Sequence, residues 1–294
     1  MTTPLGFAIV TGILAGGFVA APTGKDFTPM TSGTTLSLIG LWGASPRDVF
    51  AVGDGGTVLR YEGRAWTPMT VAGTPHLTSV WGSSASDVFA VGDGGVILHY
   101  EGRGWTSMAS GTEKILDCVW GTSPTDVFTA GEDGTILHYD GKSWSGMASG
   151  TTELLMGVWG ASPRDVFAVG MSGTVVHYDG AAWRPMVTGS TQPLAAVWGR
   201  TGRDVFAAGG GGTILHYDGA TFSAMETGTA AMLFRAWGRA GDDVYVTGEQ
   251  GILLHYDGSS WRRAPTGTTE PLYTVWGAGP EVFVVGGGGT ILHR

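Results

Sequence analysis

The chain has 294 residues, a formal net charge of −9 and one cysteine, Cys118. An acidic chain repels a phosphate backbone on average, so we expect no nucleic-acid partner, and a single cysteine excludes an internal disulfide. The 52 glycines favour many short strands joined by tight turns over long helices.

Residues 1–22 contain no charged side chain and include a mostly apolar run from Leu5 to Ala21. The run is short for a membrane span but suits the apolar core of a secretory signal, so we expect no stable membrane span. The alternative is a decayed repeat, because Gly16 to Val19 aligns with Gly55 to Val58 at a shift of 39 residues. A signal predicts a secreted or cell-envelope protein, whereas a repeat remnant leaves a cytoplasmic location open.

A 39-residue repeat organises residues 23–294. Its clearest mark is a Trp-Gly pair at a fixed position of each repeat, with the tryptophans at Trp42, Trp81, Trp120, Trp159, Trp198, Trp237 and Trp276. A fixed period of this length indicates a repeat architecture, in which each unit buries its apolar face against its neighbour. We therefore expect one domain rather than two.

Each repeat contains four short runs with high β propensity. In the second repeat they are Leu77 to Trp81, Asp87 to Val91, Val96 to Tyr100 and Trp105 to Met108, and Gly82 is expected to end the first. Four antiparallel strands repeated about a circle form a β-propeller blade. The predicted fold is an all-β, seven-bladed β-propeller of four-stranded antiparallel blades.

The two ends of the chain are expected to share the last blade. The seventh repeat stops after its third strand, whereas Phe27 to Thr31 carries the signature of a fourth strand at the other terminus. Pairing of this segment beside Thr290 to His293 would close the ring with an N-terminal strand and leave no open sheet edge there.

A histidine recurs at the end of the third strand in six repeats, at His99, His138, His177, His216, His255 and His293. A carboxylate begins the second strand of every repeat, at Asp48, Asp87, Asp126, Asp165, Asp204, Asp243 and Glu281. Hairpin geometry brings these two ends together, which predicts a structural hydrogen bond within each blade. A ring of metal sites is disfavoured, because each blade offers one histidine and one carboxylate, too few ligands for a metal.

The repeat motif, well shown from Trp159 to Trp183, resembles the bacterial propeller repeats of the Asp-box (BNR) and photosystem II assembly factor type. The resemblance implies a seven-bladed propeller, usually secreted or in the envelope, that binds glycans or other proteins; a minority of such families are sialidases. The motif departs from an Asp box, since one residue fewer separates Asp140 from Trp144 and His138 replaces the usual serine. The sialidase arginine triad and tyrosine nucleophile have no counterparts, so no enzyme activity is expected.

Function is sought where the repeats differ, on the rim formed by the loops between strands four and one and between strands two and three. The candidate ligand-binding residues there are Asp54, His76, Thr78, Asp93, Asp117, Glu132, Asp133, Met156, Phe234, Arg235, Glu249 and Tyr273. Carboxylates accept sugar hydroxyls or hold a cation such as calcium, and aromatic rings stack on sugars. The alternative is a solvated acidic rim without a ligand.

The sequence thus predicts a non-catalytic binding propeller that recognises a glycan or a protein segment on this rim. The alternative is a structural propeller that scaffolds protein assembly. A glycoside hydrolase with two rim carboxylates as acid and base is the weakest interpretation, because no unique nucleophile accompanies them. We expect a monomer without a required cofactor.

Overall fold

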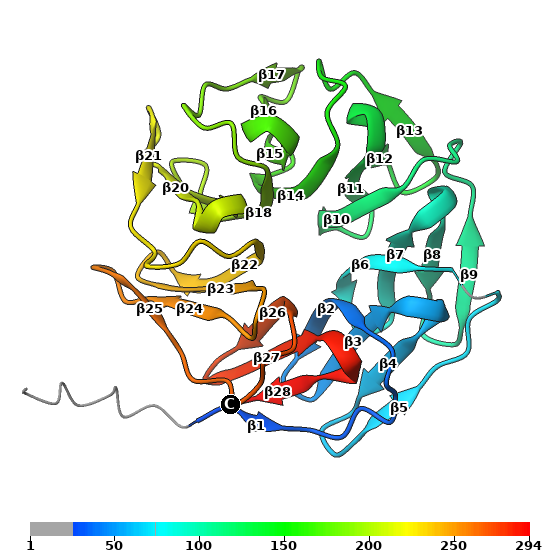
Figure 1. The fold of residues 1–294 in the computed structure, drawn as a ribbon. Coiled ribbons are helices and arrows are strands. Elements are labelled where there is room, and N and C mark those ends of the chain that lie inside the picture. Colours follow the sequence, from blue (N-terminus) through cyan, green and yellow to red (C-terminus); the bar gives the residue numbers. More distant parts are fainter. Residues whose placement is uncertain (1–25, 74) are drawn as a thin grey trace, which may run out of the picture.

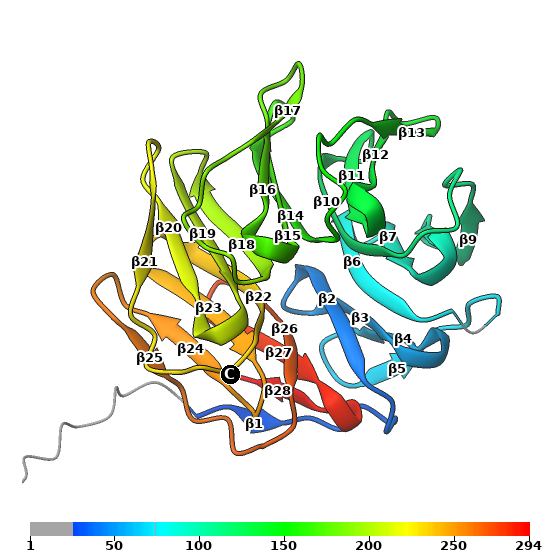
Figure 2. The ribbon, with the colours of Figure 1, turned by 45° about the horizontal axis from the view of Figure 1, so that its top comes forward.

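The chain folds into a closed ring of seven four-stranded antiparallel sheets, as predicted (Figure 1). The computed structural model describes residues 26–73 and 75–294, so both interpretations of residues 1–22 lie outside the described part. The first strand of each sheet lies nearest the central axis, and the fourth lies on the circumference. A tilted view shows the sheets standing side by side around this axis (Figure 2).

The strands follow the repeat. Blades 1 and 2 comprise β2 (Leu38–Ser45), β3 (Asp48–Gly53), β4 (Val58–Tyr61), β5 (Trp66–Pro68), β6 (Leu77–Ser84), β7 (Asp87–Gly92), β8 (Ile97–Tyr100) and β9 (Trp105–Met108). Blades 3 and 4 comprise β10 (Leu116–Ser123), β11 (Asp126–Gly131), β12 (Ile136–Tyr139), β13 (Trp144–Met147), β14 (Leu155–Ser162), β15 (Asp165–Gly170), β16 (Val175–Tyr178) and β17 (Trp183–Pro185). Blades 5 and 6 comprise β18 (Leu194–Thr201), β19 (Asp204–Gly209), β20 (Ile214–Tyr217), β21 (Phe222–Met225), β22 (Leu233–Ala240), β23 (Asp243–Gly248), β24 (Leu253–Tyr256) and β25 (Trp261–Arg263).

Blade 7 combines β26 (Leu272–Ala278), β27 (Glu281–Gly286) and β28 (Ile291–His293) with β1 (Thr28–Pro29) from the N-terminal side. Short 3-10 turns join the second and third strands of six blades, at Asp54–Gly56, Asp93–Gly95, Glu132–Gly134, Met171–Gly173, Gly210–Gly212 and Gly287–Gly289.

The glycine of the Trp-Gly pair does not end the first strand, contrary to expectation: β6 continues through Gly82 to Ser84. Its role is to receive a tryptophan. A Cβ at Gly82 would lie 2.8 Å from the ring of Trp42, on the preceding blade, and 2.7 Å from the carbonyl oxygen of Asp87. Only a residue without a side chain leaves room for that ring.

The same contact runs around the whole ring. Each of the seven glycines lies under the tryptophan of the preceding blade, in the pairs Gly43–Trp276, Gly82–Trp42, Gly121–Trp81, Gly160–Trp120, Gly199–Trp159, Gly238–Trp198 and Gly277–Trp237. The pair Gly43–Trp276 joins the last blade to the first. The repeated Trp-Gly dipeptide therefore contacts both neighbouring blades: its glycine packs under the tryptophan of the preceding blade, and its tryptophan packs on the glycine of the following blade.

The core is divided among the interfaces between neighbouring blades. At the interface of blades 3 and 4, for example, Phe128 and Ile136 pack against Leu155 and Trp183. Burying these aromatic and aliphatic side chains is the main source of stability in such a fold. Trp183, the tryptophan of the fourth strand, is thus part of the core between blades.

The N-terminal strand closes the ring where it was expected to. Within blade 7, Thr28 pairs with His293 and Pro29 with Leu292, antiparallel. The Met30 amide extends the ladder by donating to the Ile291 carbonyl at 2.9 Å. Phe27 is buried in the core between blades 6 and 7, so β1 contributes both hydrogen bonds and apolar packing.

Within the described part of the chain, no helix has the length and hydrophobicity needed to cross a bilayer.

Candidate functional site

At the rim predicted from the loops, the 3-10 turns Asp54–Gly56, Glu132–Gly134 and Gly210–Gly212 are each tied to two strand-entry loops. The Asp54 amide donates to the carbonyl of Ser37 at 3.1 Å, in its own blade. The Gly56 amide donates to the carbonyl of Pro75 at 2.7 Å, in the next blade. We call this surface the acidic rim and define it by the twelve candidate residues named above.

Arg235 crosses the central axis at the acidic rim. It lies on β22 of blade 6, and β10 of blade 3 lies on the opposite side of the axis (Figure 1). Its guanidinium donates to the Asp117 carbonyl at 3.1 Å and reaches the Asp117 carboxylate at 3.4 Å. It also donates to the Ala195 carbonyl at 2.9 Å and the Phe234 carbonyl at 3.1 Å. One side chain therefore links blades 3, 5 and 6.

The strand bearing Arg235 is distorted to accommodate it. Residues at this position in other blades are small, and a Cβ at the equivalent Gly40 would lie 2.8 Å from Val52. In β22 the irregular stretch runs from Leu233 to Ala236, one residue longer than in the other blades. The buried hydroxyl of Thr247 accepts from the Arg235 amide at 3.3 Å and donates to the Tyr273 carbonyl at 3.0 Å, which satisfies backbone groups at the distortion.

Burial raises the pKa of the Asp117 carboxyl, against the opposing charges of Arg235 and His76. The charge of Asp93 raises it further. His76 and Asp93 of blade 2 and Arg235 of blade 6 therefore lie near enough to Asp117 of blade 3 to influence its charge.

Two further contacts bring predicted residues together. The Nδ1 atom of His76 lies 2.7 Å from the Asp54 carboxylate. The rings of Phe234 and Tyr273 lie 5.4 Å apart between centroids, with an interplanar angle of 50°. Burial raises the pKa of the Tyr273 phenol, and the charge of Asp54 adds to this. Asp54, Asp93, Asp117, Arg235 and the aromatic pair thus share the surface around the axis.

The other candidate residues are engaged locally. Thr78 is buried, and its hydroxyl reaches the carbonyls of Val91 and Leu116. The carboxylates of Glu132 and Glu249 accept from the amides of Ile115 at 2.9 Å and Met232 at 3.2 Å. Asp133 pairs with Lys114 at 3.1 Å. Met156 is half-buried in β14. Apart from the Thr78–Leu116 contact, which joins blades 2 and 3, these contacts stay within one blade.

Across residues 26–73 and 75–294, no three side chains of histidine, cysteine, aspartate or glutamate gather closely enough to hold a metal ion.

The histidine–carboxylate pairs form within each blade at the opposite rim. In blades 2 to 6 the histidine Nε2 lies 2.6–2.8 Å from the aspartate Oδ1, in the pairs His99–Asp87, His138–Asp126, His177–Asp165, His216–Asp204 and His255–Asp243. In blade 1, Arg60 replaces the histidine and contacts both Asp48 oxygens at 2.9 Å. Each histidine ring also packs on the aromatic ring of the second strand. The ring centroids of His99 and Phe89, for example, lie 4.2 Å apart. The predicted hydrogen bond is thus confirmed in blades 2 to 6, whereas in blade 7 the His293 Nε2 atom lies 2.5 Å from the Glu281 carboxylate without meeting hydrogen-bond geometry.

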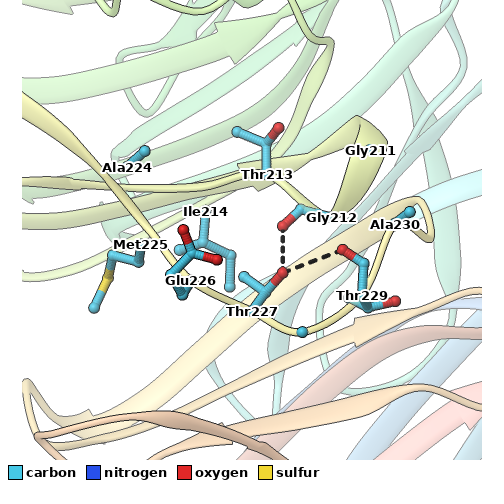
Figure 3. A pocket seen from close by; sticks show the side chains of 11 residues that line it. Gly211, Gly212, Thr213, Ile214, Ala224, Met225, Glu226, Thr227, Thr229 and Ala230 are labelled. Atoms are coloured by element: carbon cyan, nitrogen blue, oxygen red, sulfur yellow. Dashed lines mark hydrogen bonds between the residues drawn. The ribbon is translucent and has the colours of Figure 1, made fainter.

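Shallow hollows on the circumference were not predicted. One of them lies beside β21 and is lined by Met225, Glu226 and Thr227 among others (Figure 3). The Thr227 hydroxyl donates to the Gly212 carbonyl at 2.8 Å and so fixes the adjoining loop. The Ser/Thr-Gly-Ser/Thr triplet that recurs before most first strands was the sequence signal for these loops.

The closed ring of seven four-stranded blades defines a seven-bladed β-propeller. The twelve candidate side chains, at positions that differ between its repeats, lie on one face, the acidic rim. No family model matches the chain, and no curated protein matches its sequence. Among solved structures, it is similar to YCF48 bound to D1 peptide, with 17% identity, a TM-score of 0.77 and coverage of 93% of this chain and 96% of that one. It is also similar to YCF48 from Cyanidioschyzon merolae, with 16% identity, a TM-score of 0.75 and coverage of 92% and 98%.

A third similar structure is the WD40 β-propeller domain of Doa1, with 12% identity, a TM-score of 0.77 and coverage of 91% of this chain and 95% of that one. At such identities the similarity confirms the fold, while function has to be argued from the site.

Proposed function

We propose that this propeller binds a protein segment on its acidic rim, without catalysing a reaction, and that it serves protein assembly in this way. The observation that carries the proposal is the meeting of side chains from five blades around the axis: Asp54, His76, Asp93, Asp117, Phe234, Arg235 and Tyr273. Aromatic residues and arginine, such as Phe234, Tyr273 and Arg235, are enriched where a protein partner docks.

Two further points support a protein segment over a glycan or a hydrolase. The solved structures similar to this chain include a propeller described as bound to a peptide. The rim carboxylates Asp54, Asp117 and Glu132 are held by His76, Arg235 and a backbone amide respectively, which is an arrangement for positioning rather than for a mobile acid–base pair.

Selection of a random peptide library displayed on phage against the immobilised full chain tests the proposal. We expect enriched peptides whose binding falls at least fivefold when Tyr273 is replaced by alanine, since aromatic anchors commonly carry about 1 kcal/mol or more. Val187→Ala is the matched control, because this side chain is 92% exposed on the circumference. An absence of enriched peptides, or unchanged binding by folded Tyr273→Ala, would overturn the proposal.

A further inference from the structure

The arginine at the acidic rim is already engaged by the protein itself. Its guanidinium makes four contacts of 2.9–3.4 Å with Asp117, Ala195 and Phe234. An arriving carboxylate or phosphate would have to displace these acceptors, three of which are main-chain carbonyls fixed by the blades. Arg235 is therefore a structural tie across the axis and not a free anion receptor.

The carboxylates around the axis outnumber this cation. Three carboxyl groups, those of Asp54, Asp93 and Asp117, lie at this surface with a single arginine, Arg235, and only Asp117 contacts it. Asp93 is exposed, and among the described residues its carboxylate takes part in no hydrogen bond or ion pair. Asp117 gives Arg235 only one of its two oxygens, at 3.4 Å. Acceptor capacity thus remains for a second cation.

A second feature of the same surface favours a cation independently of the carboxylates. Phe234 and Tyr273 come from adjacent blades, are half-buried, and form a pair next to Arg235. Ring faces attract ammonium and guanidinium groups, and the aliphatic part of a lysine or arginine side chain packs well on them. An acidic side chain would meet repulsion from the carboxylates and no attraction from the rings.

We infer that the protein segment bound at the acidic rim presents a lysine or arginine side chain to Asp93 and Asp117, beside the Phe234–Tyr273 pair. The inference rests on the proposed function and names the chemistry of its partner. Arg235 acts as a positioning residue in this arrangement, because it holds the Asp117 carboxylate at the axis.

Three peptide display libraries on one short scaffold would test the inference, with the fixed positions occupied by lysine and arginine, by glutamate and aspartate, or by serine and glutamine. We expect enrichment from the basic library. The best-enriched basic peptide, labelled with fluorescein, should bind roughly fivefold more weakly to Asp93→Asn in fluorescence anisotropy. Its affinity should also fall with added salt, since charges at an exposed rim are screened over about 8 Å at physiological ionic strength.

Asp242→Asn is the matched control, because it removes the same charge from an exposed loop on the opposite rim. Its affinity for the labelled peptide should equal that of the unaltered chain. Equal weakening of binding by both variants would show unspecific attraction and overturn the inference. Enrichment only from the acidic or the neutral library would also overturn the inference, but it would leave the proposed function standing. No enrichment from any library would instead overturn the proposed function.

Discussion

At the scale of single residues, the repeated dipeptide shows how a short motif can encode an interface. The tryptophan ring fits only because its neighbour in space has no side chain. In blade 4, a Cβ at Gly160 would lie 2.7 Å from the Trp120 ring and 2.8 Å from the Asp165 carbonyl. Carbon atoms do not approach so closely without displacing one another, so the motif is a steric requirement.

We therefore expect Gly160→Ala to lower the free energy of unfolding by about 1–3 kcal/mol or more, through overpacking. Gly146→Ala is the control, because a Cβ there meets no atom within 4 Å. Urea denaturation followed by tryptophan fluorescence would measure both variants. Equal stabilities of the two would show that the ring can shift to make room, contrary to the steric account.

Titration provides a second prediction at this scale. Burial opposes ionisation of Asp243, but hydrogen bonds from Arg239 at 2.6 Å and His255 at 2.7 Å outweigh it and lower the pKa of the carboxyl. A carboxyl whose pKa is lower in the folded than in the unfolded state stabilises the fold at pH values above its unfolded pKa of about 3.9. This contribution is lost as the pH falls below that value. At neutral pH, Asp243→Asn should cost about 1 kcal/mol.

The difference in unfolding free energy between the unaltered chain and Asp243→Asn should shrink below about pH 4. Urea denaturation at neutral and acidic pH measures it. Asp242→Asn, one residue away in an exposed loop, separates the pair from the general effect of removing a negative charge. A difference that stays constant with pH would show that the Asp243 contacts do not depend on its charge.

At the scale of elements, the sequence allowed the strands to be located, because short runs with high β propensity, separated by glycine-containing turns, recur with one period. It misplaced the end of the first strand, since a glycine inside a strand and a glycine that ends one look alike without the neighbouring blade. The structure resolves this by placing the Trp42 ring over Gly82. Contacts between repeats, rather than local propensity, decide such positions.

The course of β22 was equally hidden. The sequence shows that Arg235 occupies a position held by small residues elsewhere, and it predicted the side chain to lie on the rim. It could not show the longer irregular stretch of the strand. Nor could it show that the buried Thr247 hydroxyl hydrogen-bonds the Arg235 backbone amide and carbonyl at this distortion. Among the twelve candidate residues, the sequence also could not separate Arg235 and Asp117, which make contact across the axis, from Thr78 and Glu132, which bond to neighbouring backbone groups.

At the scale of the whole molecule, two kinds of link hold the blades in a ring. The Trp-Gly contacts join each blade to its neighbour, whereas Arg235 joins blades 3, 5 and 6 across the axis. A repeat protein without closure depends only on nearest neighbours and can fray from its ends. Closure by β1 removes those ends, so the N-terminal strand should matter far more than its two paired residues suggest.

Removal of residues 1–33 tests this in full. It would delete β1, expose the edge of β28 and take Phe27 out of a core in which it is 8% exposed and lies 5.2 Å from the Arg294 guanidinium. We expect the melting temperature to fall by at least about 5–10 °C, since loss of one buried phenylalanine alone costs several kcal/mol. Removal of residues 1–25 is the control, because it leaves β1 and Phe27 in place. Phe27→Ala in the full chain provides the same comparison if the shortened chain does not fold. Melting curves that coincide for all of these chains would mean that the ring is held without its N-terminal strand.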